Sequence, residues 1–146
     1  MDNIRETTYG QSGSNNFVRL GVYLSLRMIR KHMPKSLNLE LLDVGCGYHA
    51  HFLNGLLPQI SRGVGIDFKV SDANKQNPRL SFIEMSAENA LPTLKSEAFD
   101  VVVMNNTLEH FWEPLEILKE AYRVLKPGGM LMVNVPNWAG KVTLEL

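Results

Sequence analysis

After Pro34, the apolar positions of the chain fall in short runs separated by polar, turn-rich or helical segments. The runs lie at residues 40–44, 63–67, 80–85, 99–105 and 130–135. Residues 101–104 are apolar on consecutive positions instead of alternating, which is typical of a strand covered on both faces. Strands that alternate with helices predict βαβ units. We therefore expect an α/β fold with a mostly parallel five-stranded sheet and helices on both faces.

Two longer segments have apolar residues at helical spacing. The first covers residues 17–33 and ends at Pro34, because proline has no amide hydrogen to continue a helix. Its apolar positions are Phe17, Leu20, Val22, Leu24, Met28, Ile29 and Met33. The second covers residues 114–126, with Pro114 in its first turn and Pro127-Gly128-Gly129 after its end. We expect its buried face to comprise Leu115, Leu118, Ala121, Tyr122 and Leu125.

Residues 1–16 are polar and without periodicity, so we expect a flexible N-terminal arm before one domain over residues 17–146. The 15 basic and 15 acidic residues balance, which gives no net attraction to nucleic acid. We expect no membrane association either, and we interpret the basic residues of the first helix as its solvated face. The single cysteine, Cys46, cannot form an internal disulfide, and the N-terminus lacks a secretory pattern. These features favour a cytoplasmic location.

A glycine-rich turn follows the first predicted strand, and an acidic residue follows the second. Gly45 and Gly47 allow a tight turn and the close approach of a ligand. Asp67 lies 20 residues after Gly47, a spacing that suits a carboxylate accepting hydrogen bonds from ribose hydroxyls. Either feature alone could be an ordinary turn or cap, but together they predict nucleoside binding.

The identity of the nucleoside is a separate question, because residues 45–50 also fit the dinucleotide pattern G-x-G-x-x-A. Asp43 helps to separate the alternatives. Its carboxylate would oppose a pyrophosphate but attract the ammonium group of a bound methionine, which favours S-adenosylmethionine over NAD. The structural alternative is that Asp43 caps the loop by accepting hydrogen bonds from backbone amides.

With these residues in place, the chain resembles the class I S-adenosylmethionine-dependent methyltransferases, in particular the small-molecule group. Four motif blocks stand in the family's order at residues 42–47, 64–67, 99–110 and 123–129, within a resemblance that covers residues 37–137. The resemblance implies a Rossmann-like fold, S-adenosylmethionine as cofactor and a small-molecule acceptor. The cofactor-binding positions that it and the spacing suggest are Asp43, Gly45, Cys46, Gly47, Asp67, Phe68, Ser86, Ala87, Glu88 and Asn105. The resemblance implies that the glycine turn passes along the methionine part of the cofactor and that Asp67 holds the ribose. It also implies that residues 86–88 contact the adenine and that Asn105 faces the methionine end.

The sequence departs from the family at two places. His49 stands where a third glycine is often seen, which puts the packing of the turn in doubt. After residues 130–135 the family normally adds a helix and two further strands, which the remaining stretch of about ten residues cannot supply. We therefore expect an incomplete fold whose last strand is left at an exposed edge, open to self-association or to a partner.

Residues in the glycine turn and after the fourth predicted strand suggest further chemistry. Cys46, His49 and His51 could suggest zinc, but no second cluster supplies a fourth ligand, so we expect no metal and a buried, inert thiol. His110 is the candidate general base near the transferred methyl group, although methyl transfer to a good nucleophile needs little acid–base help. Two rivals to the methyltransferase remain: an NAD-linked oxidoreductase fragment, and a non-catalytic subunit that binds a cofactor or a partner.

Overall fold

The computed structural model of the protein describes residues 16–36 and 38–135. Its strands are β1 (Leu39–Val44), β2 (Ile60–Asp67), β3 (Leu80–Glu84), β4 (Phe99–Asn105) and β5 (Leu125–Asn134). Its α-helices are α1 (Asn16–His32), α2 (His51–Leu56), α3 (Asp72–Lys75), α4 (Ala87–Ala90) and α5 (Pro114–Val124), with 3-10 turns η2 (Leu91–Thr93) and η3 (Leu108–His110). The arm expected at residues 1–16 falls outside the described residues, apart from Asn16, which begins α1.

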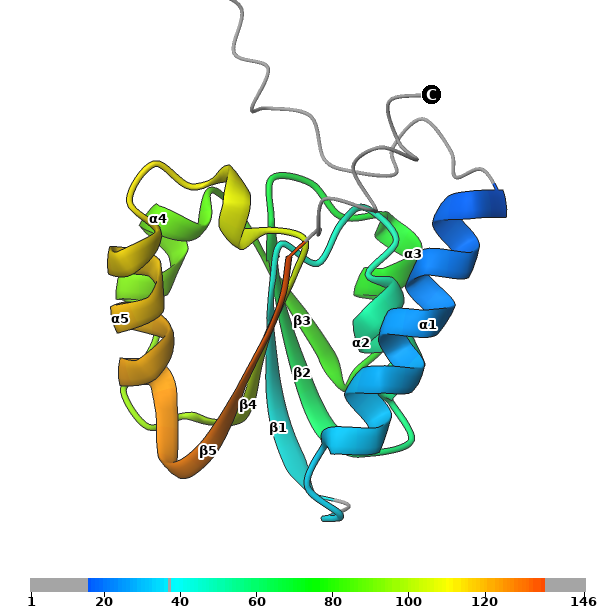
Figure 1. Ribbon diagram of the computed structural model, residues 1–146, viewed down its shortest axis with the longest axis horizontal. Helices are drawn as coiled ribbons and strands as arrows, with labels where there is room; N and C mark the ends of the chain where they lie inside the picture. The colour runs from blue at the N-terminus through cyan, green and yellow to red at the C-terminus, as the bar shows by residue number, and fades with distance from the viewer. Residues whose placement is uncertain (1–15, 37, 136–146) are drawn as a thin grey trace, which may run out of the picture.

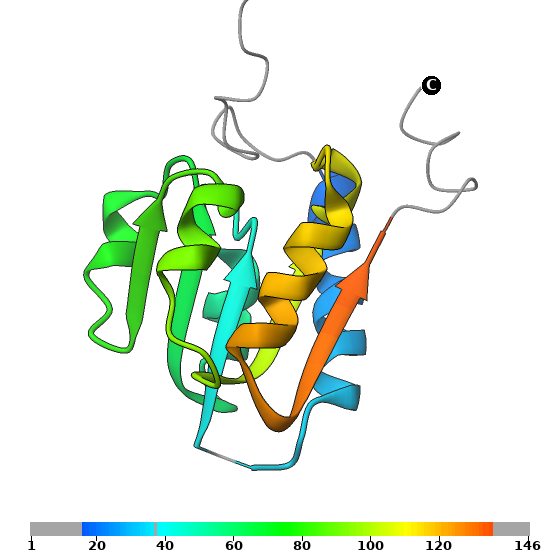
Figure 2. The same ribbon diagram turned by 90° about the vertical axis from the view of Figure 1, so that its left-hand side faces the viewer.

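The five strands form one sheet in the order β3-β2-β1-β4-β5, and every neighbouring pair is parallel. Figure 1 shows α1, α2 and α3 on one face of the sheet and α4 and α5 on the other. Figure 2 shows β3 and β5 at its two ends. The predicted α/β architecture is therefore confirmed. A partner or second copy at the β5 edge stays a prediction.

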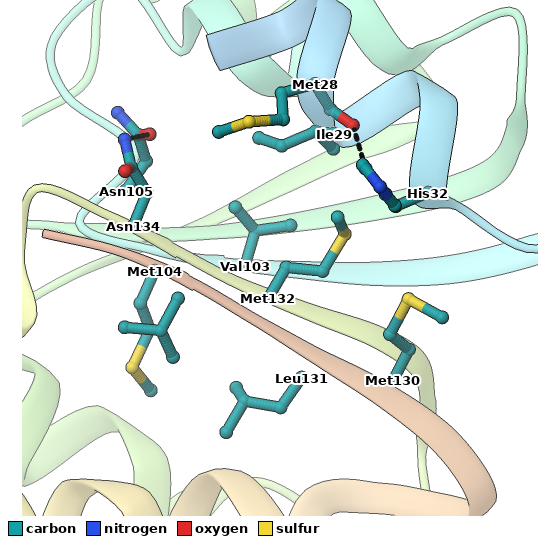
Figure 3. Close-up of a pocket in the computed structure, with 11 residues that line it drawn as sticks. Met28, Ile29, His32, Val103, Met104, Asn105, Met130, Leu131, Met132 and Asn134 are labelled. Carbon is teal, nitrogen blue, oxygen red and sulfur yellow. Dashed lines mark hydrogen bonds between the residues drawn. The ribbon is translucent and has the colours of Figure 1, made fainter.

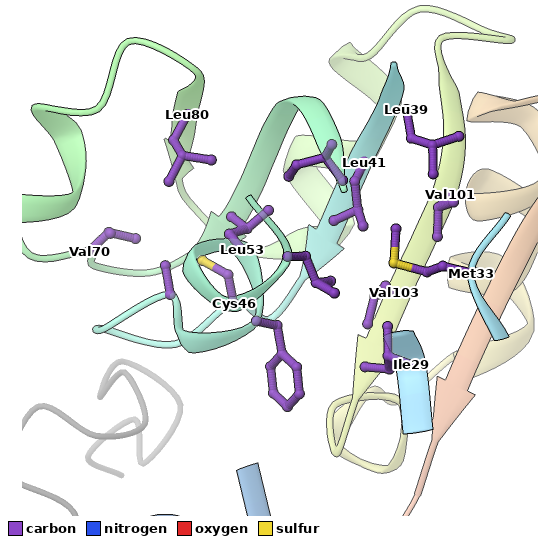
Figure 4. Packing of buried hydrophobic residues seen from close by; sticks show 14 residues of the cluster. Ile29, Met33, Leu39, Leu41, Cys46, Leu53, Val70, Leu80, Val101 and Val103 are labelled. Atoms are coloured by element: carbon purple, nitrogen blue, oxygen red, sulfur yellow. The ribbon is translucent and has the colours of Figure 1, made fainter. Parts of the chain in front are cut away.

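Each face of the sheet has its own hydrophobic core, as expected for strands buried on both sides. On the α1 face, Ile29 of α1 and Met33, just after its end, pack with Leu41, Val101 and Val103 of β1 and β4 (Figure 4). On the opposite face, α5 packs on the residues of β1 and β4 that alternate with these. They include Leu42, Val44, Val102 and Met104. The consecutive apolar positions of residues 101–104 are thus divided between two cores.

The buried face of α5 differs from the prediction, and only some of the apolar positions of α1 are buried. On α5 the buried residues are Ile117, Ala121 and Val124, whereas Leu115 and Tyr122 are exposed. On α1, Ile29 is buried, but Leu20, Leu24 and Met28 are exposed. Each helix carries two apolar stripes at helical spacing, and the sheet can cover only one of them. Among the described helices, none is long and apolar enough to cross a bilayer.

The predicted boundary between α5 and β5 was also wrong. The helix ends at Val124 instead of residue 126, and β5 begins at once with Leu125. Leu125 pairs with Phe99 and Met130 with Val101, so residues 126–129 bulge opposite a single residue of β4. Within this bulge, Lys126 Nζ lies 2.9 Å from Asp100 Oδ2 and 3.1 Å from Glu40 Oε2. These ion pairs hold the bulge against the amino ends of β1 and β4.

Candidate functional site

The candidate site lies at the carboxyl edge of the sheet, at the arrowhead ends of the strands in Figure 2. In chain order, β2 and β3 are added on one side of the central strand β1, and β4 and β5 are then added on the other side. Open α/β sheets bind ligands outside the carboxyl ends of their strands at such a reversal of strand order. The predicted site residues lie on or just after these strand ends.

The glycine turn after β1 has the backbone that its sequence predicts. Gly45 and Gly47 adopt φ values of 79° and 72°, in the left-handed region that favours glycine. The amides of Gly45 and Cys46 donate to the carbonyl oxygen of Ile66 at 2.8 and 3.1 Å, which ties the turn to β2. A Cβ on Gly45 would lie 2.4 Å from Thr107 Oγ1, so only glycine fits beneath the turn after β4.

Asp67 joins the end of β2 to the glycine turn. Its Oδ2 accepts a hydrogen bond from the amide of Gly47 at 2.8 Å, and its Oδ1 accepts one from the amide of Phe68 at 2.8 Å. An ionised carboxylate has about four acceptor sites, so both oxygens can accept further hydrogen bonds. The structure brings Asp67 and Gly47 together as the spacing predicts, while ribose binding stays a prediction.

Asp43 carries a fully buried carboxylate. Its side chain is 0% exposed, and in the described part of the chain neither oxygen accepts a hydrogen bond. The alternative that Asp43 caps the loop through backbone amides is therefore wrong. Burial, and to a lesser extent the negative charge of Asp67, raise the pKa of Asp43 to about 7. An unpartnered buried carboxylate is costly, and it provides a place for a cationic group.

Cys46 contributes to the core instead of presenting a reactive thiol. Its side chain is buried, and a Cβ on Gly65 would meet its sulfur at 2.8 Å. Burial raises the pKa of the Cys46 thiol, and the charges of Asp43 and Asp67 raise it further. Any contact of Cys46 with a cofactor would therefore come from its backbone. In the part of the chain that the structure describes, no group of three or more His, Cys, Asp or Glu side chains could hold a metal ion.

The ends of β2 and β3 present apolar side chains to solvent beside the residues proposed to meet adenine. Phe68 and Met85 are both exposed, and the strand residues before them, Asp67 and Glu84, are in register. Ser86 is half-buried and precedes α4 without a side-chain cap. Met85 falls in a predicted strand, and nothing in the sequence marked its side chain as a surface for a ring. Within the predicted adenine segment, Ala87 is buried and Glu88 is exposed.

The ends of β4 and β5 are joined by an amide pair. Asn134 Nδ2 donates to Asn105 Oδ1 at 2.9 Å, and the amide of Asn106 donates to the carbonyl oxygen of Asn134 at 2.7 Å. Asn105 was predicted as a site residue but Asn134 was not, although a polar residue at the carboxyl end of a parallel strand is itself a signal. Thr107 was not predicted either, because its contact with Gly45 depends on the tertiary fold.

His110 ends the turn η3, and its side chain is 75% exposed. Its Nε2 lies 4.0 Å from Glu109 Oε1. This contact does not fix the imidazole firmly, so a role for His110 as general base stays a prediction.

Comparison with known proteins agrees with the motif pattern. A sequence model described as a methyltransferase domain matches residues 42–133. The chain is 29% identical over 102 residues to a "Probable S-adenosylmethionine-dependent methyltransferase" of Mycolicibacterium smegmatis, which covers 67% of this chain and 38% of that protein. It is 28% identical over 111 residues to the "Ubiquinone biosynthesis O-methyltransferase" of Parvibaculum lavamentivorans, which covers 68% of this chain and 41% of that protein. The chain thus spans about two fifths of the length of these relatives.

The fold comparison leads to the same family. A solved S-adenosylmethionine-dependent methyltransferase from Thermotoga maritima superposes with a TM-score of 0.62 at 26% sequence identity. The match covers 85% of this chain and 57% of that one. Because the domain model spans most of the chain, from the glycine turn to β5, the chain belongs to the class I S-adenosylmethionine-dependent methyltransferase family.

Proposed function

We propose that the whole protein transfers a methyl group from S-adenosylmethionine to a small-molecule acceptor. The observation that carries this proposal is the buried, unpartnered carboxylate of Asp43 beside the glycine turn. A carboxylate there favours a ligand that brings a cation, and the amino-acid part of S-adenosylmethionine carries an ammonium group.

The same observation disfavours NAD. A dinucleotide places its pyrophosphate at the glycine turn and the following helix N-terminus. Here Asp43 lies two residues before that turn, and ionised Asp43 would repel the phosphates. The helix that follows, α2, has only six residues and a preceding residue, Ala50, at a φ of 45°. These features support S-adenosylmethionine over the G-x-G-x-x-A alternative.

Each contact in the proposed site comes from a strand end described above. The glycine turn would pass the methionine part, with the backbone of Cys46 within it, and Asp67 would accept hydrogen bonds from the ribose. Phe68, with residues 86–88, would border the adenine, and Asn105 would face the methionine end. Bound S-adenosylmethionine supplies a methyl group whose carbon–sulfur bond breaks as an acceptor lone pair bonds to carbon, leaving a neutral thioether.

The acceptor proton can leave to water or to a general base, and His110 is the proposed base. Alignment of acceptor and methyl group can supply much of the rate enhancement without a base. In the whole protein, His110→Ala is expected to lower kcat by about 100-fold if His110 takes the proton, without changing cofactor affinity. An unchanged kcat would exclude His110 as the base. That the acceptor is small is supported by the relative named as an enzyme of ubiquinone biosynthesis.

The proposal is tested by calorimetric titration of the purified chain with S-adenosylhomocysteine and, separately, with NAD. We expect S-adenosylhomocysteine alone to bind, with a dissociation constant in the micromolar range, which corresponds to a binding free energy of about 8 kcal/mol. Binding of NAD alone would overturn the proposal. Binding of neither ligand to the full-length gene product would support the alternative of a non-catalytic subunit.

A further inference from the structure

A groove of about 410 Å³ runs between α1 and β5. Figure 3 shows Met28 and Ile29 of α1 on one side of it and Val103 and Met132 of the sheet on the other. Met104 and Met130 are also among the lining residues, which therefore include four methionines. Methionine adapts its shape to apolar ligands, and this volume lies within the range of small-molecule sites.

One end of the groove is polar and lies at the carboxyl edge of the sheet. There Asn134 Nδ2 donates to Asn105 Oδ1 at 2.9 Å, and both side chains line the groove (Figure 3). This bond uses one hydrogen and one lone pair of the two amides, so each amide can form further hydrogen bonds with a ligand. Asn105 is also the residue proposed above to face the methionine end of the cofactor. The groove therefore continues into the proposed point of methyl transfer.

The lining also limits the charge of what can bind. Among the eleven described residues that line the groove there is no Lys, Arg, Asp or Glu, and His32 is the only titratable one. The Nδ1 of His32 is held 2.9 Å from the carbonyl oxygen of Met28. A charged ligand would lose hydration in this groove without gaining an ionic partner, which disfavours it.

We propose that this groove binds the methyl acceptor, and that the acceptor is an elongated, largely apolar small molecule with one neutral hydrogen-bonding group. The apolar body lies along Met28, Met130 and Met132, and the polar group meets the Asn105–Asn134 pair. This places the hydrogen-bonding end of the acceptor next to the transferred methyl group. The inference rests on the proposed function, because it takes the end of β4 as the site of transfer.

The test uses 4-hexylphenol and phenol as probes on the protein saturated with S-adenosylhomocysteine. The two share a hydroxyl group and differ only in the apolar tail, so 4-hexylphenol is expected to bind about tenfold more tightly or better. Location is read from the NMR signals of 13C-labelled methionine methyl groups. We expect 4-hexylphenol to shift the methyl signals of Met28, Met130 and Met132. We expect S-adenosylhomocysteine to shift the methyl signal of Met85, beside Ser86.

Two variants on the same helix give a matched control. Met28 and Leu20 are 53% and 54% exposed, but only Met28 lines the groove. Met28→Gln is expected to lower the affinity for 4-hexylphenol about threefold or more, whereas Leu20→Gln is expected to leave this affinity unchanged. Thermal unfolding of both variants checks that the fold is retained.

Equal affinities for phenol and 4-hexylphenol would overturn the groove assignment. So would shifts confined to other methionines, or equal effects of the two variants. Each of these results leaves cofactor binding intact. Failure of S-adenosylhomocysteine to bind would instead overturn the proposed function, and with it the role of the groove in methyl transfer.

Discussion

The carboxylate of Asp67 accepts a hydrogen bond from the amide of Gly47, 20 positions earlier in the chain, at 2.8 Å. Its second oxygen accepts from Phe68 at the same distance. One side chain thus fixes the glycine turn against the end of β2 while both its oxygens keep a free lone pair. Asp67 therefore has a structural role in the turn and a proposed role toward ribose, and experiment must separate them.

Replacement of Asp67 by alanine is expected to weaken the binding of S-adenosylhomocysteine by about 1 to 3 kcal/mol, which is the scale of lost charge-assisted hydrogen bonds. Asp67→Asn keeps an acceptor for one amide but loses the charge, so it should retain more of the stability than of the affinity. Calorimetry gives the affinity and thermal unfolding the stability. Asp72→Ala, which removes a carboxylate that is 96% exposed, is the control. Unchanged affinity in Asp67→Ala would exclude the ribose role.

Gly45 and Gly128 have the same φ of 79° but different surroundings. A Cβ on Gly45 would collide with Thr107, whereas a Cβ on Gly128 would meet nothing within 4 Å. Gly128→Ala should therefore cost about 1 to 2 kcal/mol of unfolding free energy, from backbone strain alone. Gly45→Ala should cost more and should also abolish cofactor binding. Urea unfolding of both variants measures the difference.

The same pair gives a double-mutant cycle. Thr107→Ala removes the two side-chain atoms nearest to the added Cβ, so it should recover part of the stability lost in Gly45→Ala. It should recover none in Gly128→Ala. Equal costs for the two glycine variants would show that the close approach of Thr107 does not restrict the turn.

The contact between Gly47 and Asp67 could be predicted from sequence because it depends on local features. A glycine turn after one strand and an acidic residue after the next must meet if the two strands are parallel neighbours. The strands themselves were predictable for a similar reason: β4 is apolar on consecutive positions and was predicted with its observed bounds. β2 begins at Ile60, earlier than expected, because its exposed residues Ser61 and Arg62 interrupt the apolar run.

The helix faces could not be predicted in this way. Leu115 and Tyr122 lie on one apolar stripe of α5, and Ile117 and Val124 on another, and periodicity alone does not say which stripe meets the sheet. Thr107 and Asn134 were missed because their roles come from contacts between strands far apart in sequence. Such contacts depend on the assembled sheet, which a single motif does not describe.

Asp43 is expected to make the stability of the fold depend on pH. Its pKa is 3.8 in its ordinary state and about 7 in the folded protein, so the folded state binds the proton more tightly. The resulting stabilisation is complete below about pH 4 and is lost as pH rises through 7, by about 1.4 kcal/mol per pH unit. Asp43→Asn removes this dependence.

The stability of Asp43→Asn relative to the parent protein should therefore rise between pH 5 and pH 7 and then level off. Urea unfolding across pH 5 to 8 measures it. A constant difference between the two proteins would show that Asp43 is ionised throughout this range, against the effect expected from its burial.

Cofactor binding should be coupled to the same proton. If the ammonium group of S-adenosylhomocysteine lies near Asp43, it favours the ionised carboxylate, so binding below pH 7 must release the proton of Asp43. The affinity should then fall as pH drops below about 7, by up to about tenfold per pH unit. Calorimetry in two buffers of different ionisation enthalpy counts the protons, and we expect about one released at pH 6 and almost none at pH 8.5.

A ligand and a variant together assign this proton to Asp43. 5′-Methylthioadenosine keeps the adenosine part but lacks the amino-acid part, so its binding should release no proton at pH 6. Asp43→Asn should abolish the release for S-adenosylhomocysteine as well. If both ligands released a proton, the source would be a group near the nucleoside, and the ammonium would not lie at Asp43. If only S-adenosylhomocysteine did so, and only with Asp43 present, the buried carboxylate would be the partner of the methionine end.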